Sequence, residues 1–185
     1  MRILTCFLFL LCCGLPLVAQ DAPPSLSQRE IGLRLSGLNT FGFIYKRQVS
    51  DFQYRRVRVA SGALSVRSGG NIGLDFNVAF GKEKRQPLGS DFFFHHGAEP
   101  FLGAAINGRE QRGSRVTIFQ LTGGLGYVVG FQKYLSDELT IGIESIPAVS
   151  LAYSANNVAS GSDILFQAGF NANAVALTIT YAFLR

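Results

Sequence analysis

The chain has 185 residues, a formal net charge of +5, and a composition that is 48% hydrophobic, with 21 glycines and 16 phenylalanines. This length favours a single domain. The charge excess is small and the basic residues are scattered, which argues against a nucleic-acid-binding protein.

The first twenty residues, MRILTCFLFLLCCGLPLVAQ, have the pattern of a secretory signal peptide, with Arg2 ahead of an apolar run that ends in small residues. We predict cleavage after Ala19 or Gln20, with residues 1–19 as the signal and 20–185 as the mature domain. A membrane anchor is disfavoured because the apolar run is short for a spanning helix. A lipoprotein signal is the remaining alternative.

The cysteines of the chain, Cys6, Cys12 and Cys13, all lie within this first segment. The mature domain therefore has no disulfide, no thiolate metal site and no cysteine nucleophile. Export without disulfides is more typical of a bacterial envelope protein than of a small secreted eukaryotic domain.

Nearly every later segment alternates apolar with small or polar side chains, which is the pattern of a two-faced β-strand. Eight such runs follow one another: EIGLRLSG, TFGFIYKR, YRRVRVASG, NIGLDFNVAFGKE, DFFFHHGAEPFLGAAI, VTIFQLTGGLGYVVGFQK, ELTIGIESIPAVSLAY and residues 164–183. The first two runs share one parity over 31–45 and could form one long strand. The last run would span about 70 Å at about 3.3 Å per residue, so we expect it to protrude, to bend near Gly169, or to break at Asn171–Asn173. Eight strands are predicted, and ten are possible.

Compact turns alternate with longer connections along the chain. QVSD, KRQPLGSD and LSDE are compact, whereas GALSVRSGGN, NGREQRGS and SANNVASGS are longer and rich in glycine, serine and asparagine. Membrane barrels have short periplasmic turns and longer outer loops. We therefore expect the compact turns in the periplasm and loops near 63–71, 107–115 and 154–163 outside. Pro100 and Pro147 lie within runs and predict bulges.

The fold class that follows is all-β: a closed antiparallel transmembrane β-barrel. In lipid the backbone must satisfy its own hydrogen bonds, which only a closed barrel achieves with strands. The rival fold is a soluble lipocalin-like barrel, which would need polar outward positions.

The last strand, ALTITYAFLR, places Leu177, Ile179, Tyr181 and Phe183 on one face. It resembles the C-terminal recognition signal of bacterial outer-membrane β-barrel proteins, except that the last aromatic residue is not the final residue. The wider chain resembles small barrels of the OmpA-like eight-stranded type, most closely those of Bacteroidota. The resembling segments are IYKRQVSDFQYRRVRV, GLDFNVAFGKEKRQ, HHGAEPF, GLGYVVGFQKYLSDELTIGIESIP and GFNANAVALTITYAFLR.

This resemblance implies a location in the bacterial outer membrane and contact with its lipid. It also implies recognition by the barrel assembly machinery and by periplasmic chaperones, and it implies no catalytic activity. We expect a monomer.

The inward parity collects charged residues, for which we predict a network in the lumen: Arg56, Arg58, Asp75, Glu83, Glu99 and Glu144. An eight-stranded barrel is just wide enough for side chains to fill it, so opposite charges there should pair. The expected result is a plug of ion pairs, and the alternative is a narrow pore for small solutes. The glycines of GGLG should make room in the lumen.

No catalytic residue, metal site or cofactor is predicted. Adjacent strand residues point to opposite faces, so His95 and His96 should not chelate a metal ion. A lipid A hydrolase would need a serine, a histidine and an acid near the outer rim, whereas these histidines fall at the periplasmic end. The expected role is structural or surface-interacting.

Overall fold

The computed structural model describes residues 28–36, 41–61, 65–67, 71–111, 114–157, 162–169 and 175–183. The predicted signal peptide, residues 1–19, lies outside the described residues. Within those ranges, no helix is long and apolar enough to cross a membrane.

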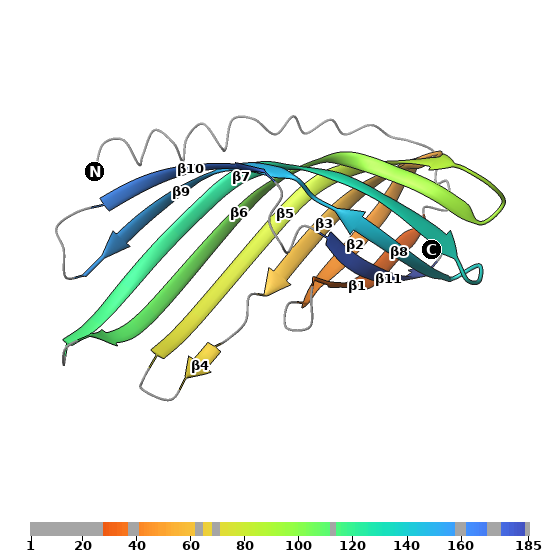
Figure 1. Cartoon of the computed structure of the whole chain (residues 1–185). Helices are drawn as coiled ribbons and strands as arrows, with labels where there is room; N and C mark the ends of the chain where they lie inside the picture. Colours follow the sequence, from red (N-terminus) through yellow and green to blue (C-terminus); the bar gives the residue numbers. More distant parts are fainter. Residues whose placement is uncertain are drawn as a thin grey trace.

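Eleven antiparallel strands make up the described part of the chain (Figure 1). Their bounds are β1 Arg29–Leu35, β2 Phe41–Ser50, β3 Gln53–Ser61, β4 Ser65–Arg67, β5 Asn71–Pro87, β6 Phe92–Gln111, β7 Ser114–Tyr134, β8 Leu139–Ser145, β9 Ala148–Asn156, β10 Ser162–Gly169 and β11 Val175–Phe183.

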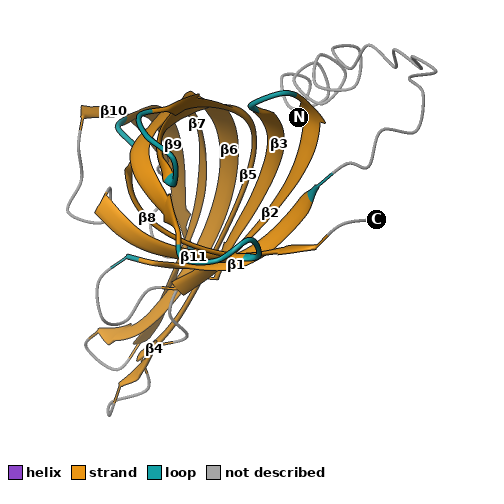
Figure 2. Ribbon diagram, turned by 90° about the vertical axis from the view of Figure 1, so that its right-hand side faces the viewer, coloured by secondary structure: helices purple, strands orange, loops and turns teal. Residues whose placement is uncertain are grey.

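Eight of these strands close into a ring in the order β1, β2, β3, β5, β6, β7, β8 and β11, and β11 pairs with β1. Figure 2 shows β11 and β1 side by side where the two ends of the sheet meet. The predicted closed eight-stranded antiparallel barrel is confirmed. The short β4, together with β9 and β10, lies outside the ring.

The ring closes with a stagger. The stagger is found by starting at Leu35 of β1 and moving to the directly opposite residue on each neighbouring strand in turn. Across β2, β3, β5 and β6 this path reaches Leu121 of β7. In the other direction the path leads through β11 and β8 to Phe131 of the same strand, ten residues further along. Such a shift in register is what tilts the strands of a closed barrel against its axis.

The first hairpin divides the stretch that could have been one long strand. Leu35 of β1 lies opposite Phe41 of β2, and the strands pair down to Arg29 and Arg47. The two runs are therefore neighbouring strands, with residues 37–40 between them outside the described residues.

The strands β8 and β9 follow one another along β7 as two segments of one line of chain, which is interrupted at Ile146–Pro147. Both keep the same register against β7, with Ser145 opposite Val129 and Ala148 opposite Gly126. The Pro147 carbonyl still accepts a hydrogen bond of 2.9 Å from the Tyr127 amide. The ladder to β7 thus continues past the proline without an extra residue.

The extra residues lie on the neighbouring line, formed by β10 and β11. Gly169 is opposite Ala148 and Val175 is opposite Ser145, so the chain has five residues between Gly169 and Val175 and two between Ser145 and Ala148. The long final run is therefore divided after Gly169, and Asn171–Asn173 lie outside the described residues. The bulge predicted at Pro147 is wrong for the strand path that carries the proline, because its register against β7 is unchanged, and the additional residues lie between β10 and β11.

The bulge predicted at Pro100 is wrong. Pro100 lies opposite Leu125 in an unbroken register between β6 and β7. The register of β6 against β5 is also the same on both sides of it, with Phe101 opposite Ala79 and His96 opposite Lys84. A missing amide donor is tolerated here without the insertion of a residue.

The strands β5, β6 and β7 run far beyond the ring (Figure 1). They contain 17, 20 and 21 residues, whereas β1 contains 7. The loop predicted near 107–115 is wrong, because β6 continues to Gln111 and β7 starts at Ser114. The loop predicted near 154–163 is shorter than expected, since β9 continues to Asn156 and β10 starts at Ser162.

The two faces of the barrel differ as the alternation predicted. Large apolar side chains are exposed on the outside of seven of the eight ring strands, and on β3 the outward Val57 and Val59 are half-buried. The exposed residues include Ile31, Phe43, Phe76, Phe80, Leu102, Leu125, Phe131, Ile143 and Ile179. The inner face carries charged, hydroxyl and small side chains. This arrangement is the reverse of a lipocalin-like barrel, which places its apolar residues inside.

Candidate functional site: an ion-pair layer in the lumen

Nine charged side chains from six ring strands meet inside the described part of the barrel, and we call them the lumen ion-pair layer. They are Glu30 and Arg34 of β1, Lys46 of β2, Arg56 and Arg58 of β3, Glu83 and Arg85 of β5, Glu99 of β6 and Glu144 of β8. Each occupies an inward position of its strand, because side chains alternate across a strand.

Arg56 lies at the centre of this layer and contacts three carboxylates. Its Nη1 donates to Glu83 Oε2 at 3.2 Å and to Glu144 Oε2 at 3.1 Å. Its Nη2 donates to Glu144 Oε1 at 3.2 Å, and its Nε lies 3.2 Å from Glu99 Oε2. One guanidinium therefore connects strands β3, β5, β6 and β8 across the lumen.

Arg85 forms a second centre nearer the compact turns. Its Nη1 and Nη2 donate to the two oxygens of Glu30, each at 2.7 Å, and its Nε donates to Glu83 at 2.9 Å. The same guanidinium donates to the Tyr134 hydroxyl at 3.1 Å and lies 3.7 Å from the centre of the Tyr54 ring. A planar guanidinium suits this combination of a bidentate carboxylate and an aromatic face.

The remaining cations complete the layer. Lys46 Nζ donates to Glu83 at 2.9 Å, and Arg34 Nε donates to Glu144 at 2.7 Å. Arg58 donates to Glu99 from Nη2 at 2.8 Å. Every carboxylate in the layer has at least one cation, which is what charged groups need when they are removed from water.

The centre of the layer is fully buried. The side chains of Arg56, Glu83, Glu99 and Glu144 are 0% exposed. These four side chains therefore fill the centre of the layer.

His95 lies at the edge of the layer, and His96 points the other way. The His95 ring is buried, with Nε2 3.7 Å from Glu144 Oε2, and a Cβ on Gly130 would lie 2.7 Å from it. His96 is on the outer face, where Nδ1 lies 2.8 Å from the Tyr127 hydroxyl. Within the described ranges, no group of three His, Cys, Asp or Glu residues is placed to hold a metal ion.

Glycines on the inner face leave space for the side chains that occupy the lumen, as at Gly124 in the GGLG segment. A Cβ there would lie 2.6 Å from the Phe101 ring. A larger residue would collide with that ring, so the glycine allows an aromatic side chain to occupy the lumen above the layer.

The structure brings five of the six predicted lumen residues into contact: Arg56, Arg58, Glu83, Glu99 and Glu144. Asp75 lies further along β5, opposite Ala105, where it is exposed and outside the layer. The prediction did not include Glu30, Arg34, Lys46 or Arg85. The alternation of their strands placed these residues on the inward face, but charged residues near strand ends are equally typical of solvated termini.

The residues predicted as the assembly signal lie on β11, between β1 and β8. Leu177, Ile179 and Tyr181 point outward and are exposed, while Phe183 is half-buried. The strand therefore presents an apolar outer face at the seam where the barrel closes.

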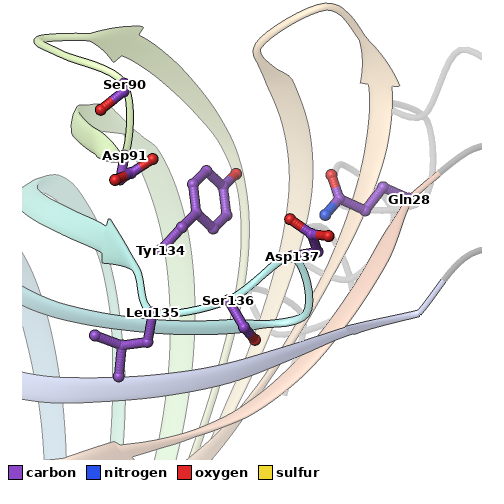
Figure 3. A pocket seen from close by; sticks show the side chains of 7 residues that line it. All are labelled: Gln28, Ser90, Asp91, Tyr134, Leu135, Ser136 and Asp137. Carbon is purple, nitrogen blue, oxygen red and sulfur yellow. The ribbon is translucent and has the colours of Figure 1, made fainter.

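A pocket opens at the compact-turn end of the barrel (Figure 3). It has a volume of about 460 Å³ and is lined by Gln28, Ser90, Asp91, Tyr134, Leu135, Ser136 and Asp137. Tyr134 also accepts the hydrogen bond from Arg85. One residue of the pocket lining therefore contacts the ion-pair layer.

No protein-family model and no curated protein matches the chain. Solved structures that resemble it include Neisserial surface protein A, at 12% identity and a TM-score of 0.49 over 85% of this chain and 94% of that one. The N-terminal β-barrel domain of Pseudomonas aeruginosa OprF matches at 10% identity and 0.47, over 85% and 96% of the two chains. Ail, the attachment invasion locus protein of Yersinia pestis, matches at 13% and 0.45, over 85% and 97%. At such low values, function has to be argued from the geometry of this chain itself.

Proposed function

We propose that this chain is an integral β-barrel of the bacterial outer membrane with a structural or surface-interaction role and a plugged lumen. The observation that carries the proposal is the apolar outer face of a closed ring. Exposed apolar patches of a few hundred Å² already mark contact with a partner or a membrane, and here exposed apolar residues lie on seven of the eight ring strands. Lipid is the environment in which that face is stable.

The proposal places the compact turns in the periplasm and the long strands outside. A strand of 20 residues, the length of β6, rises about 50 Å at a tilt of about 40°. The apolar band of such barrels is about 25 Å tall. The sheet of β5, β6, β7, β9 and β10 thus reaches well past the membrane and offers a surface to other molecules.

The ion-pair layer supports the structural role over the alternative of a narrow pore. Its central side chains are fully buried and each carboxylate is paired. A solute could pass only if several buried ion pairs separated together.

In this proposal residues 1–19 direct export, and the chain is bound by periplasmic chaperones and inserted by the barrel assembly machinery. Leu177, Ile179, Tyr181 and Phe183 would supply the recognised face. Support comes from the outward position of the first three on the strand that closes the ring.

Electrophoretic mobility in SDS, boiled against unboiled, on the isolated outer-membrane fraction is the direct test. A closed membrane barrel resists SDS until it is heated, so we expect a heat-dependent shift in that fraction. Recovery of the protein in the soluble periplasm, without a shift, would contradict the proposal.

A further inference from the structure

Four cations stand side by side on the outer face of the barrel, and we call them the basic row. Arg29 of β1 lies opposite Arg47 of β2, Arg47 lies opposite Arg55 of β3, and Arg55 lies opposite Lys82 of β5. Directly opposed side chains have Cβ atoms about 5 Å apart, so the row extends over about 15 Å, or three strand spacings. All four occupy outward positions, and Arg47, Arg55 and Lys82 are exposed.

The basic row lies where the apolar band ends. Each of the four strands has an outward apolar residue two positions further from the compact turns than its basic residue. These apolar residues lie opposite one another and form the next row: Ile31, Tyr45, Val57 and Phe80. Ile31 is 52% exposed and Phe80 is 57% exposed. If the apolar row contacts acyl chains, the basic row lies at the depth of the headgroups.

Among the residues that the structure describes, the basic row has no counter-charge. The ion pairs of the described residues belong to the lumen, and none includes Arg29, Arg47, Arg55 or Lys82. The Arg29 Nε is buried without a hydrogen-bond partner. Like charges directly opposite each other destabilise a sheet, and this row contains three such pairs in succession.

We propose that the basic row binds the phosphate of an anionic phospholipid in the leaflet on the compact-turn side. Guanidinium groups donate in a planar fork that matches phosphate oxygens, and long basic side chains keep their stems on apolar surface while their heads reach the interface. A bound phosphate neutralises the repulsion between the cations of the row. This inference rests on the proposed residence of the barrel in a membrane.

The test is the lipid preference of the full mature chain in phosphatidylcholine vesicles, measured by electron paramagnetic resonance of spin-labelled phosphatidylglycerol against spin-labelled phosphatidylcholine. We expect the wild type to associate with the anionic lipid more strongly by roughly fivefold, the scale of one basic residue at an anionic surface. The triple variant Arg47→Gln, Arg55→Gln, Lys82→Gln should reduce the ratio to about one.

Lys133→Gln is the matched control. Lys133 is also exposed and outward at this end of the barrel, but it lies between Phe92 and Ile141 and has no cation opposite it. It should leave the lipid preference unchanged. Equal preference in wild type and triple variant would overturn the proposal, as would loss of the preference in millimolar inorganic phosphate, which would indicate a site for the free ion.

Insertion into the membrane is measured separately, by the heat-dependent mobility shift in SDS after reconstitution in phosphatidylcholine alone. A barrel that inserts but shows no lipid preference refutes the basic row as a site and leaves the membrane proposal intact. If the triple variant does not insert, Arg55→Gln alone and wild type in about 1 M NaCl replace it, since the screening length there is about 3 Å. Both should lower the preference.

Discussion

Arg56 and Glu144 are 88 residues apart in the sequence and meet in the lumen through two hydrogen bonds, one to each carboxylate oxygen. The pair joins the third strand of the barrel to the strand that precedes the closing one. It also links Glu83 and Glu99, because the same guanidinium contacts both. The layer therefore behaves as one coupled unit, and its residues should affect stability far more than their outward neighbours.

Replacement of Arg56 by methionine should destabilise the barrel by about 3–5 kcal/mol, because three buried carboxylates lose a cation. The measurement is the free energy of unfolding in urea in a zwitterionic detergent, followed by the SDS mobility shift. Arg55→Met is the control, since Arg55 is the adjacent residue and points outward. Its effect should stay below about 1 kcal/mol. Similar losses for both variants would contradict the lumen assignment.

Glu30 and Arg85 should be strongly coupled. Their bidentate pair has two bonds of 2.7 Å, and both side chains are buried. In a double-mutant cycle with Glu30→Met and Arg85→Met, we expect the double variant to be more stable than the sum of the single losses by about 1–3 kcal/mol. Additive losses would mean that the two groups do not pair.

The wild-type barrel should form no reproducible channels in planar lipid bilayers. The physical reason is the complete burial of Arg56, Glu83, Glu99 and Glu144. Reconstitution should be verified on the same sample by the heat shift in SDS. Steady, stepwise conductance from the folded protein would argue for the narrow pore instead.

Gly126→Ala should destabilise the barrel by about 1–3 kcal/mol through overpacking. A Cβ at this position would lie 2.8 Å from Ile146 Cγ2, beside the break in the β8–β9 line. The second substitution Ile146→Ala should recover part of the loss. Gly89→Ala is the control, because a Cβ there meets nothing within 4 Å. Equal thermal midpoints for the Gly126 and Gly89 variants would refute the crowding.

Tyr181→Ser should lower the amount of folded barrel in the outer membrane of expressing cells, if the last strand is the assembly signal. Tyr45→Ser is matched to it, since both tyrosines are outward and exposed by 47% and 37%. The two purified variants should refold equally well in detergent, because each loses one outward aromatic side chain. If both variants assemble equally well in cells, the outward face of the last strand is not the recognition signal for assembly.

Strand content and the two faces could be predicted from the sequence, because alternation with period two is a local property. The run from Ile72 to Phe80, for example, fixes which side chains of β5 point outward without reference to other strands. The same alternation predicted that five residues of the ion-pair layer face the lumen: Arg56, Arg58, Glu83, Glu99 and Glu144. The closed ring was predicted from the requirement that strands in lipid satisfy all their backbone hydrogen bonds.

Only the tertiary structure decided which strands are neighbours, with what stagger, and how far they extend. Asp75 shares the inward parity of Glu83 but lies too far along β5 to reach the ion-pair layer. Arg29, Arg47, Arg55 and Lys82 are scattered in the sequence and become a row because of three separate registers. Register depends on hydrogen bonds between residues distant in the chain, whereas alternation depends on adjacent residues. The sequence by itself therefore determined the faces, and the closure of the barrel determined which charges meet on them.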